Sequence, residues 1–102
     1  MQPNRNFADR LRRLRRKKGV GLKRAAPQLG VSYTYLSKIE NNKAVPSTEL
    51  LERIATYYEA DTDELFMLAD KIPDDIRDIL RENPREALDF LRQRFSGEFT
   101  SE

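Results

Sequence analysis

The sequence of 102 residues contains neither cysteine nor histidine. The absence of cysteine excludes disulfides and thiolate metal sites. The absence of histidine removes the commonest metal ligand and the commonest general base. The chain also has no glycine-rich phosphate loop that would complete a catalytic site. We therefore expect no bound metal, no cofactor and no enzymatic activity.

Long hydrophobic runs are missing as well, so no segment is expected to span a membrane. The first ten residues, MQPNRNFADR, lack the apolar centre of a signal peptide, which predicts a cytoplasmic protein. The length suits one small domain with a short appendage.

Charge is distributed very unevenly along the chain. Residues 1–46 contain twelve Lys and Arg against two Asp and Glu, whereas residues 47–102 contain seven against fifteen. The first part therefore has a formal charge of +10 and the second a charge of −8. This asymmetry indicates a face that binds a polyanion and a separate face with another role, although solvated helix surfaces would give the same counts.

Hydrophobic spacing and capping residues predict helices throughout, so the fold class is all-α. The first helix is expected at about residues 6–18. Gly21 and Gly30 bound a second helix, and Ser32 caps a third. Pro27 falls inside the second helix, which we therefore expect to be kinked or partly 3₁₀.

Further caps predict four more helices. Ser47 precedes the fourth helix and Asp61 the fifth, Pro73 begins the sixth, and Asn83 caps a seventh that ends near residue 94. The segment LGVS between the second and third helices has the form of a helix-turn-helix unit.

Three segments carry a resemblance to a known family: LRRLRRKKGVGL, LGVSYTYLSKIENN and VPSTELLERIATYYEADTDELF. They closely resemble the XRE family of bacterial and phage regulators, which includes the lambda-type repressors and Cro. The resemblance implies a five-helix lambda-repressor-like DNA-binding domain at residues 6–69, followed by two short C-terminal helices. A flexible tail is expected at residues 96–102.

The resemblance also assigns roles to individual residues. The third helix becomes the recognition helix, with base-reading side chains at Tyr33, Thr34, Ser37 and Lys38. Phosphate contacts fall to Lys23, Arg24, Asn41 and Lys43. Arg15 and Glu40 match the structural ion pair of the family, and Tyr35 is expected to pack on the domain surface. Gly21 and Leu22 depart from the usual Ser/Thr-Gln start of the second helix, so the phosphate contact of that glutamine is absent.

Residues 72–95 carry more apolar side chains than two solvated helices need. We expect them to form a homodimer interface, with an intramolecular lid on the first and fifth helices as the alternative. The side chains concerned are Ile72, Ile76, Ile79, Leu80, Leu88, Leu91 and Phe95.

Together these features predict a sequence-specific regulator that binds double-stranded DNA, acting as a homodimeric repressor on an inverted-repeat operator. The first alternative is an antitoxin or adaptor of the same fold that binds a toxin or a protease and autoregulates its operon. The second is a basic surface on the first helix that binds RNA or anionic membrane. That surface is the weaker alternative, because the same helix supplies the core residues Phe7, Leu11 and Leu14.

Overall fold

A computed structural model describes residues 5–96, and within that range the chain forms helices and no strand. This confirms the all-α class. The helices are α1 (Arg5–Lys18), α2 (Leu22–Gln28), α3 (Tyr33–Glu40), α4 (Thr48–Tyr58), α5 (Thr62–Leu68), α6 (Asp74–Glu82) and α7 (Pro84–Phe95). The chain divides into a first unit that ends at Lys71 and a second that begins at Ile72. No helix of the described range is long and apolar enough to cross a membrane.

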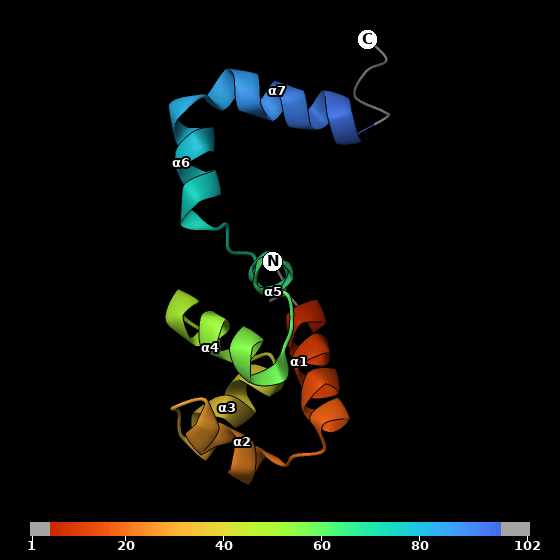
Figure 1. The fold of residues 1–102 in the computed structure, drawn as a ribbon, viewed down its shortest axis with the longest axis vertical. Helices are drawn as coiled ribbons and strands as arrows, with labels where there is room; N and C mark the ends of the chain where they lie inside the picture. The colour runs from red at the N-terminus through yellow and green to blue at the C-terminus, as the bar shows by residue number, and fades with distance from the viewer. Residues whose placement is uncertain (1–4, 97–102) are drawn as a thin grey trace. The chain divides into compact units, whose positions relative to one another are not determined.

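The first unit is built from α1–α5 around one hydrophobic core (Figure 1). α1 contacts α3, α4 and α5, while α2 contacts α3 and α4 contacts α5. Each helix contributes a stripe at helical spacing, such as Phe7, Leu11 and Leu14 of α1, and all three are buried. Through its stripe α1 packs against the core that the other helices of the unit share.

The caps expected from the sequence are present in this unit. The side-chain oxygens of Ser32, Ser47 and Asp61 accept backbone N–H groups at 3.0, 3.1 and 3.1 Å, in the first turns of α3, α4 and α5. Gly30 (φ 74°) and Asn42 (φ 63°) are left-handed, as expected. The Ser32 cap and the two left-handed residues fix where α3 begins and how the chain leaves it.

α2 continues through Pro27 as an α-helix, so the expectation of a partly 3₁₀ helix is wrong. Pro27 is exposed, and its ring deprives only the carbonyl of Lys23 of a helical partner. Lys23 is exposed too. At the end of the helix, the N–H of Leu29 bonds the carbonyls of Ala25 and Ala26 at 3.0 and 3.1 Å. The helix therefore closes normally after the proline, and its expected bend stays a prediction.

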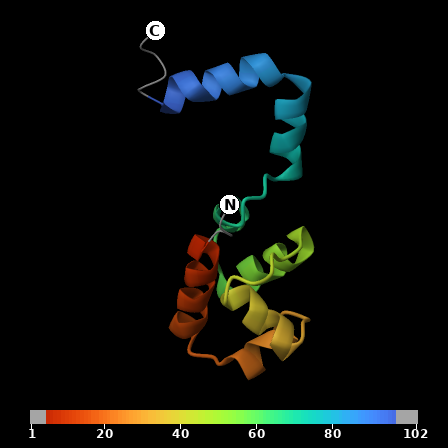
Figure 2. The same ribbon diagram turned by 180° about the vertical axis from the view of Figure 1, so that it is seen from behind.

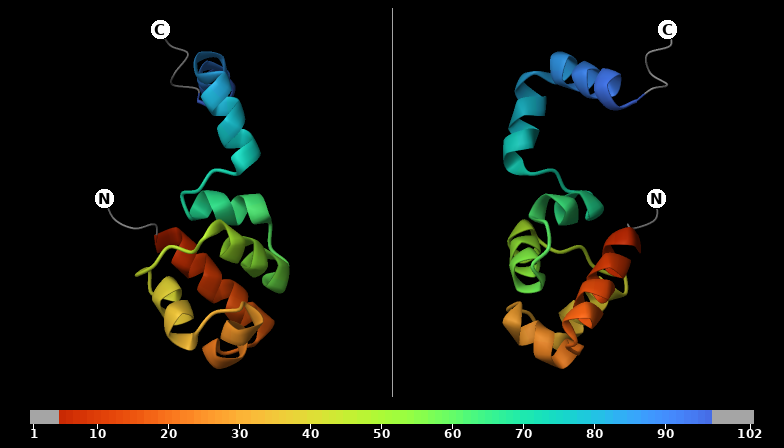
Figure 3. Two further views of the ribbon diagram at one scale, coloured as in Figure 1. Left: turned by 90° about the vertical axis from the view of Figure 1, so that its left-hand side faces the viewer. Right: turned by 45° about the vertical axis from the view of Figure 1, so that its right-hand side comes forward.

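The second unit consists of α6 and α7, which meet at an angle (Figure 3). Neither helix has a buried residue. Asn83 lies between them and is the N-cap residue of α7, as expected, but its side chain makes no cap hydrogen bond there. Its amide Nδ2 instead donates to the carbonyl of Ile79 at 3.2 Å, because the last carbonyls of α6 also need donors. Of the expected tail, residues 97–102 lie outside the described residues.

Candidate functional site

α2 and α3 lie side by side and are joined by a four-residue turn (Figure 2). The N–H of Gly30 bonds the carbonyl of Pro27, and the N–H of Val31 bonds that of Ala26, both at 3.0 Å. This pair of bonds is a Schellman motif, and the left-handed Gly30 permits it. Two residues later Ser32 caps α3. The turn thus sets the angle at which α3 leaves α2.

Arg53 of α4 holds the same turn from outside. Its Nε donates to the carbonyl of Leu29 at 2.9 Å. The guanidinium also covers Gly30, with its Nε 3.7 Å from the place that a Cβ would occupy. Nothing in the sequence distinguishes this arginine from other charged residues of α4, so sequence reasoning missed it.

One face of α3 is available to a partner. Leu36 and Ile39 are buried, whereas Tyr33 is 50 % exposed and both Thr34 and Lys38 are exposed. Ser37, the fourth predicted base-reading residue, is less exposed than these three because it is half-buried. Its Oγ accepts a hydrogen bond from the side-chain amide of Asn41 at 3.2 Å. Tyr35 is half-buried and packs against the core, as expected.

The predicted phosphate contacts differ in how free their donors are. Lys23 and Arg24, in the first turn of α2, are exposed, and so is Lys43 beyond α3. Asn41 is exposed as well, but its Nδ2 also donates to the carbonyl of Ser37, at 2.8 Å. Its amide therefore caps the end of α3, and a phosphate contact requires that side chain to turn outward.

The end of α3 is tied to α1 by an ion pair. Arg15 donates from Nε and Nη2 to the two carboxylate oxygens of Glu40, at 2.8 and 3.0 Å, and from Nη1 to the carbonyl of Val20 at 3.1 Å. Glu40 is 3 % exposed, and its hydrogen bond raises the pKa of the Arg15 guanidinium. Arg12 donates to the backbone carbonyl of Glu40 and pairs with Asp9. This second arginine had no signal in the sequence beyond the basic run.

Much of the basic run on α1 is structural. In addition to the contacts of Arg12 and Arg15, Arg10 pairs with Glu64 at 3.4 Å, and the Lys18 ammonium lies 4.7 Å from the centre of the Tyr57 ring. Arg13, Arg16 and Lys17 are exposed. The free positive charge of α1 is thus smaller than its sequence suggests.

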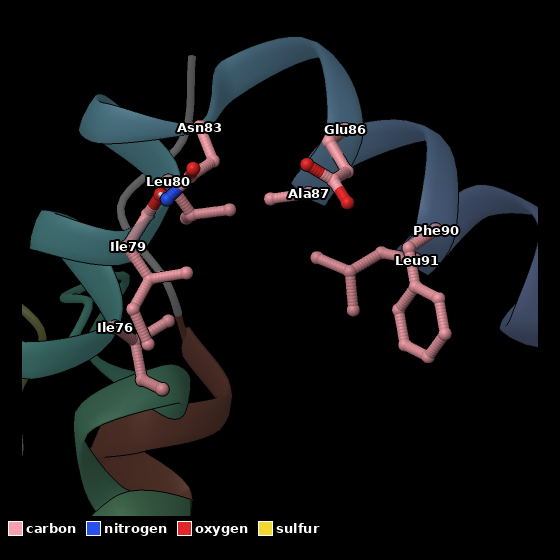
Figure 4. Close-up of a pocket in the computed structure, with 8 residues that line it drawn as sticks. All are labelled: Ile76, Ile79, Leu80, Asn83, Glu86, Ala87, Phe90 and Leu91. Carbon is pink, nitrogen blue, oxygen red and sulfur yellow. Dashed lines mark hydrogen bonds between the residues drawn. The ribbon is translucent and has the colours of Figure 1, made fainter.

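A groove between α6 and α7 is the second candidate surface. Figure 4 shows Ile76 and Ile79 of α6 and Leu91 of α7 pointing into the space between the two helices. Leu80 also lines the groove, whereas Ile72, Leu88 and Phe95 of the predicted interface do not. Sequence reasoning missed Phe90, which lines it and is 63 % exposed. Its spacing of three from Ala87 was the available signal.

Comparison with protein families gives one match. The model of a family described as a helix-turn-helix domain matches residues 6–66, which is more than half of the chain. No curated protein and no solved structure matches the chain. The matched range covers α2, the turn and α3, and it ends within α5.

Proposed function

The chain belongs to the helix-turn-helix domain family, and from that premise we propose that it is a sequence-specific DNA-binding transcriptional regulator. α3 enters the major groove of double-stranded DNA as the recognition helix. Lys38 donates to guanine O6 or N7, and Thr34 offers a hydroxyl and a methyl group to base edges. Tyr33 contacts the neighbouring base or sugar.

One observation carries this proposal: α3 buries its apolar side and leaves Tyr33, Thr34 and Lys38 exposed beside a turn held by four hydrogen bonds, one of them the cap from Ser32. A rigid helix with an exposed polar face is what groove readout requires. Lys23, Arg24 and Lys43 supply phosphate contacts around it, while the nearby carboxylate of Glu40 is already paired with Arg15.

In finer detail, we propose that the chain is an XRE-type repressor and acts as a homodimer on an inverted repeat. Two copies of α3 then read half-sites about 34 Å apart, which is one turn of DNA. Repression is favoured over activation because residues 5–96 carry no evident activation surface.

Selection of bound sequences from a random pool of duplex DNA, at two salt concentrations, tests the proposal. We expect an enriched inverted repeat at both, with weaker binding at the higher salt. Thr34→Ala should alter the enriched sequence, whereas Lys17→Ala, on the exposed side of α1, should leave it unchanged. Binding without enrichment at either salt concentration would reduce the protein to a nonspecific polyanion binder.

A second candidate function is an antitoxin or adaptor, in which the helix-turn-helix domain regulates an operon and the second unit binds a toxin or a protease. The exposed apolar residues of α6 and α7 favour it, because a protein partner would cover them. The two functions differ in what occupies the groove between α6 and α7.

A further inference from the structure

The groove between α6 and α7 is large and apolar for so small a unit. Its volume is about 450 Å³, and six of its eight lining residues are apolar (Figure 4). Ile79 at its α6 side is 51 % exposed and Phe90 at its α7 side is 63 % exposed. Two helices of nine and twelve residues cannot cover these side chains themselves. Exposed apolar side chains gathered in a groove are typical of a surface that another molecule covers.

We propose that a second copy of this chain fills the groove. α7 of each copy lies between α6 and α7 of the other and runs antiparallel to the other copy's α6. The arrangement has two-fold symmetry, so each groove is closed by the same element. The inference rests on the proposed function in one respect: an inverted repeat needs two copies of α3, and this interface supplies the pairing.

The charged residues at the ends of α6 and α7 are complementary to those of a second copy. The first turn of α6 holds Asp74 and Asp75, and the last turn of α7 holds Arg92 and Arg94. An antiparallel pairing of α6 with the other copy's α7 brings these opposite charges together. Two such contacts form in the dimer, one at each end of the symmetric interface.

The net charge of the second unit is small, so the like-charge repulsion between two copies is weak. Residues 47–71 hold two basic and seven acidic residues, whereas residues 72–102 hold five and eight. The second unit thus has a formal charge of −3, and most of the acidity of the second half of the chain belongs to the first unit.

α7 itself has the shape of an inserted helix. Ala87, Phe90 and Leu91 line its own groove, while Leu88 and Phe95 are exposed outside it. A helix that is apolar on two adjoining sides has to be covered on both. Placement between two helices of another copy achieves this, whereas a small ligand in the groove would leave Leu88 and Phe95 in water.

Sedimentation equilibrium of the full chain without DNA tests the proposal. We expect a dimer, and we expect Ile79→Asp to raise the dissociation constant at least about 30-fold, because a carboxylate is placed in an apolar contact. Met67→Asp is the matched control: Met67 is 56 % exposed on α5, in the first unit. Phe90→Asp serves as a second variant on α7, and far-ultraviolet circular dichroism checks that the helices persist. A monomeric parent chain, or a dimer weakened by Met67→Asp and not by the groove variants, would overturn the proposal.

Crosslinking locates the partner, because the chain has no natural cysteine. A single cysteine placed by Phe90→Cys should give a covalent dimer with a short bismaleimide, and one placed by Met67→Cys should not. Binding of a small apolar ligand by a monomeric chain would contradict the inference. These measurements contain no DNA, so they test the interface separately from the proposed function. If the chain is a dimer but selects no DNA sequence, only the proposed function is refuted. If the chain is a monomer but still selects a DNA sequence, only the interface is refuted.

Discussion

Arg15 of α1 and Glu40 at the end of α3 form a two-pronged ion pair in a site almost closed to water, with N–O distances of 2.8 and 3.0 Å. The pair joins the helix that anchors the core to the last residue of the proposed recognition helix. Two planar groups held by two hydrogen bonds fix orientation as well as distance. The pair therefore sets the position of α3 on the rest of the domain.

Glu40→Gln should lower the free energy of unfolding by about 3–5 kcal/mol, because it leaves the Arg15 guanidinium without its anion in a buried site. Urea unfolding followed by circular dichroism measures the change. The double variant Arg15→Met, Glu40→Met should recover part of the loss, since it leaves no unpaired charge.

The control for this prediction is an exposed pair. Asp89 lies 3.3 Å from Arg85 and 3.6 Å from Arg92 on the surface of α7. Asp89→Asn should change the free energy of unfolding by less than about 1 kcal/mol, because water screens exposed charges. Equal losses for Glu40→Gln and Asp89→Asn would contradict the buried role of the Arg15–Glu40 pair.

The two glycines that bound α2 should respond oppositely to substitution. Gly30 has a φ of 74°, so Gly30→Ala should lower the free energy of unfolding by about 1–2 kcal/mol through the left-handed backbone. Gly21 is the N-cap, its φ of −88° suits any residue, and no atom lies within 4 Å of an added Cβ. Gly21→Ser should therefore stabilise the protein by a few tenths of a kcal/mol, through a side-chain cap. Thermal unfolding of both variants checks the signs, and a loss for Gly21→Ser would show that Gly21 is not the cap.

Local chemistry explains which features could be predicted from the sequence. Ser32, Ser47, Gly30 and Asn42 act within one turn of the chain, so their roles follow from residue type and spacing. The contact of Arg53 with Leu29 spans 24 residues and depends on how α4 lies over the turn. No local pattern specifies such a contact, and the same holds for Arg12.

Side-chain competition explains one further miss, the side-chain cap by Asn83, and bears on the phosphate contact of Asn41, which stays a prediction. Asn83 has the right type and position to cap α7, but it also follows the last turn of α6, whose carbonyl it takes instead. Asn41 likewise turns back to Ser37. The sequence shows which donors are available, whereas the choice between two acceptors depends on the backbone that the fold builds.

Tyr58 should make the protein less stable in alkali. Burial, and then the nearby carboxylate of Glu40, raise the pKa of its phenol from 10.0 to about 12. The unfolded chain therefore loses this proton at a lower pH than the folded chain. The contribution of the Tyr58 ionisation to stability is fully present below pH 10. As the pH rises from 10 toward 12, the free energy of unfolding falls by up to about 1.4 kcal/mol per pH unit.

Tyr58→Phe isolates this contribution. The Tyr58 hydroxyl is buried and has no hydrogen-bond partner among the described residues, so its removal should raise the free energy of unfolding at pH 7 by about 1 kcal/mol. The variant should also lose the part of the decline above pH 10 that belongs to this group. Tyr33→Phe, at an exposed position of α3, is the control, and a steeper decline in Tyr58→Phe than in the parent would contradict the assignment.

Lys38 and Lys43 separate base reading from phosphate binding, because both are exposed lysines at the same end of α3. Lys38 lies on the helix, where its ammonium reaches a base edge in the proposed complex. Lys38→Ala should weaken binding to the selected duplex by about 1–3 kcal/mol and relax the preference at one base position. Lys43 follows the helix, so Lys43→Ala should weaken binding to all sequences alike and reduce the slope of log K against log salt by about one.

Fluorescence anisotropy with the selected duplex and with duplexes changed at single positions measures both effects, at three or more salt concentrations. Neither side chain is part of the core, so the two variants should unfold at the temperature of the parent. A loss of affinity then reports the loss of contacts with DNA and not a loss of folded protein. Uniform weakening by Lys38→Ala would assign Lys38 to the phosphates. Relaxed preference in Lys43→Ala would instead move base reading to the loop after α3, and the orientation proposed for α3 in the groove would then be wrong.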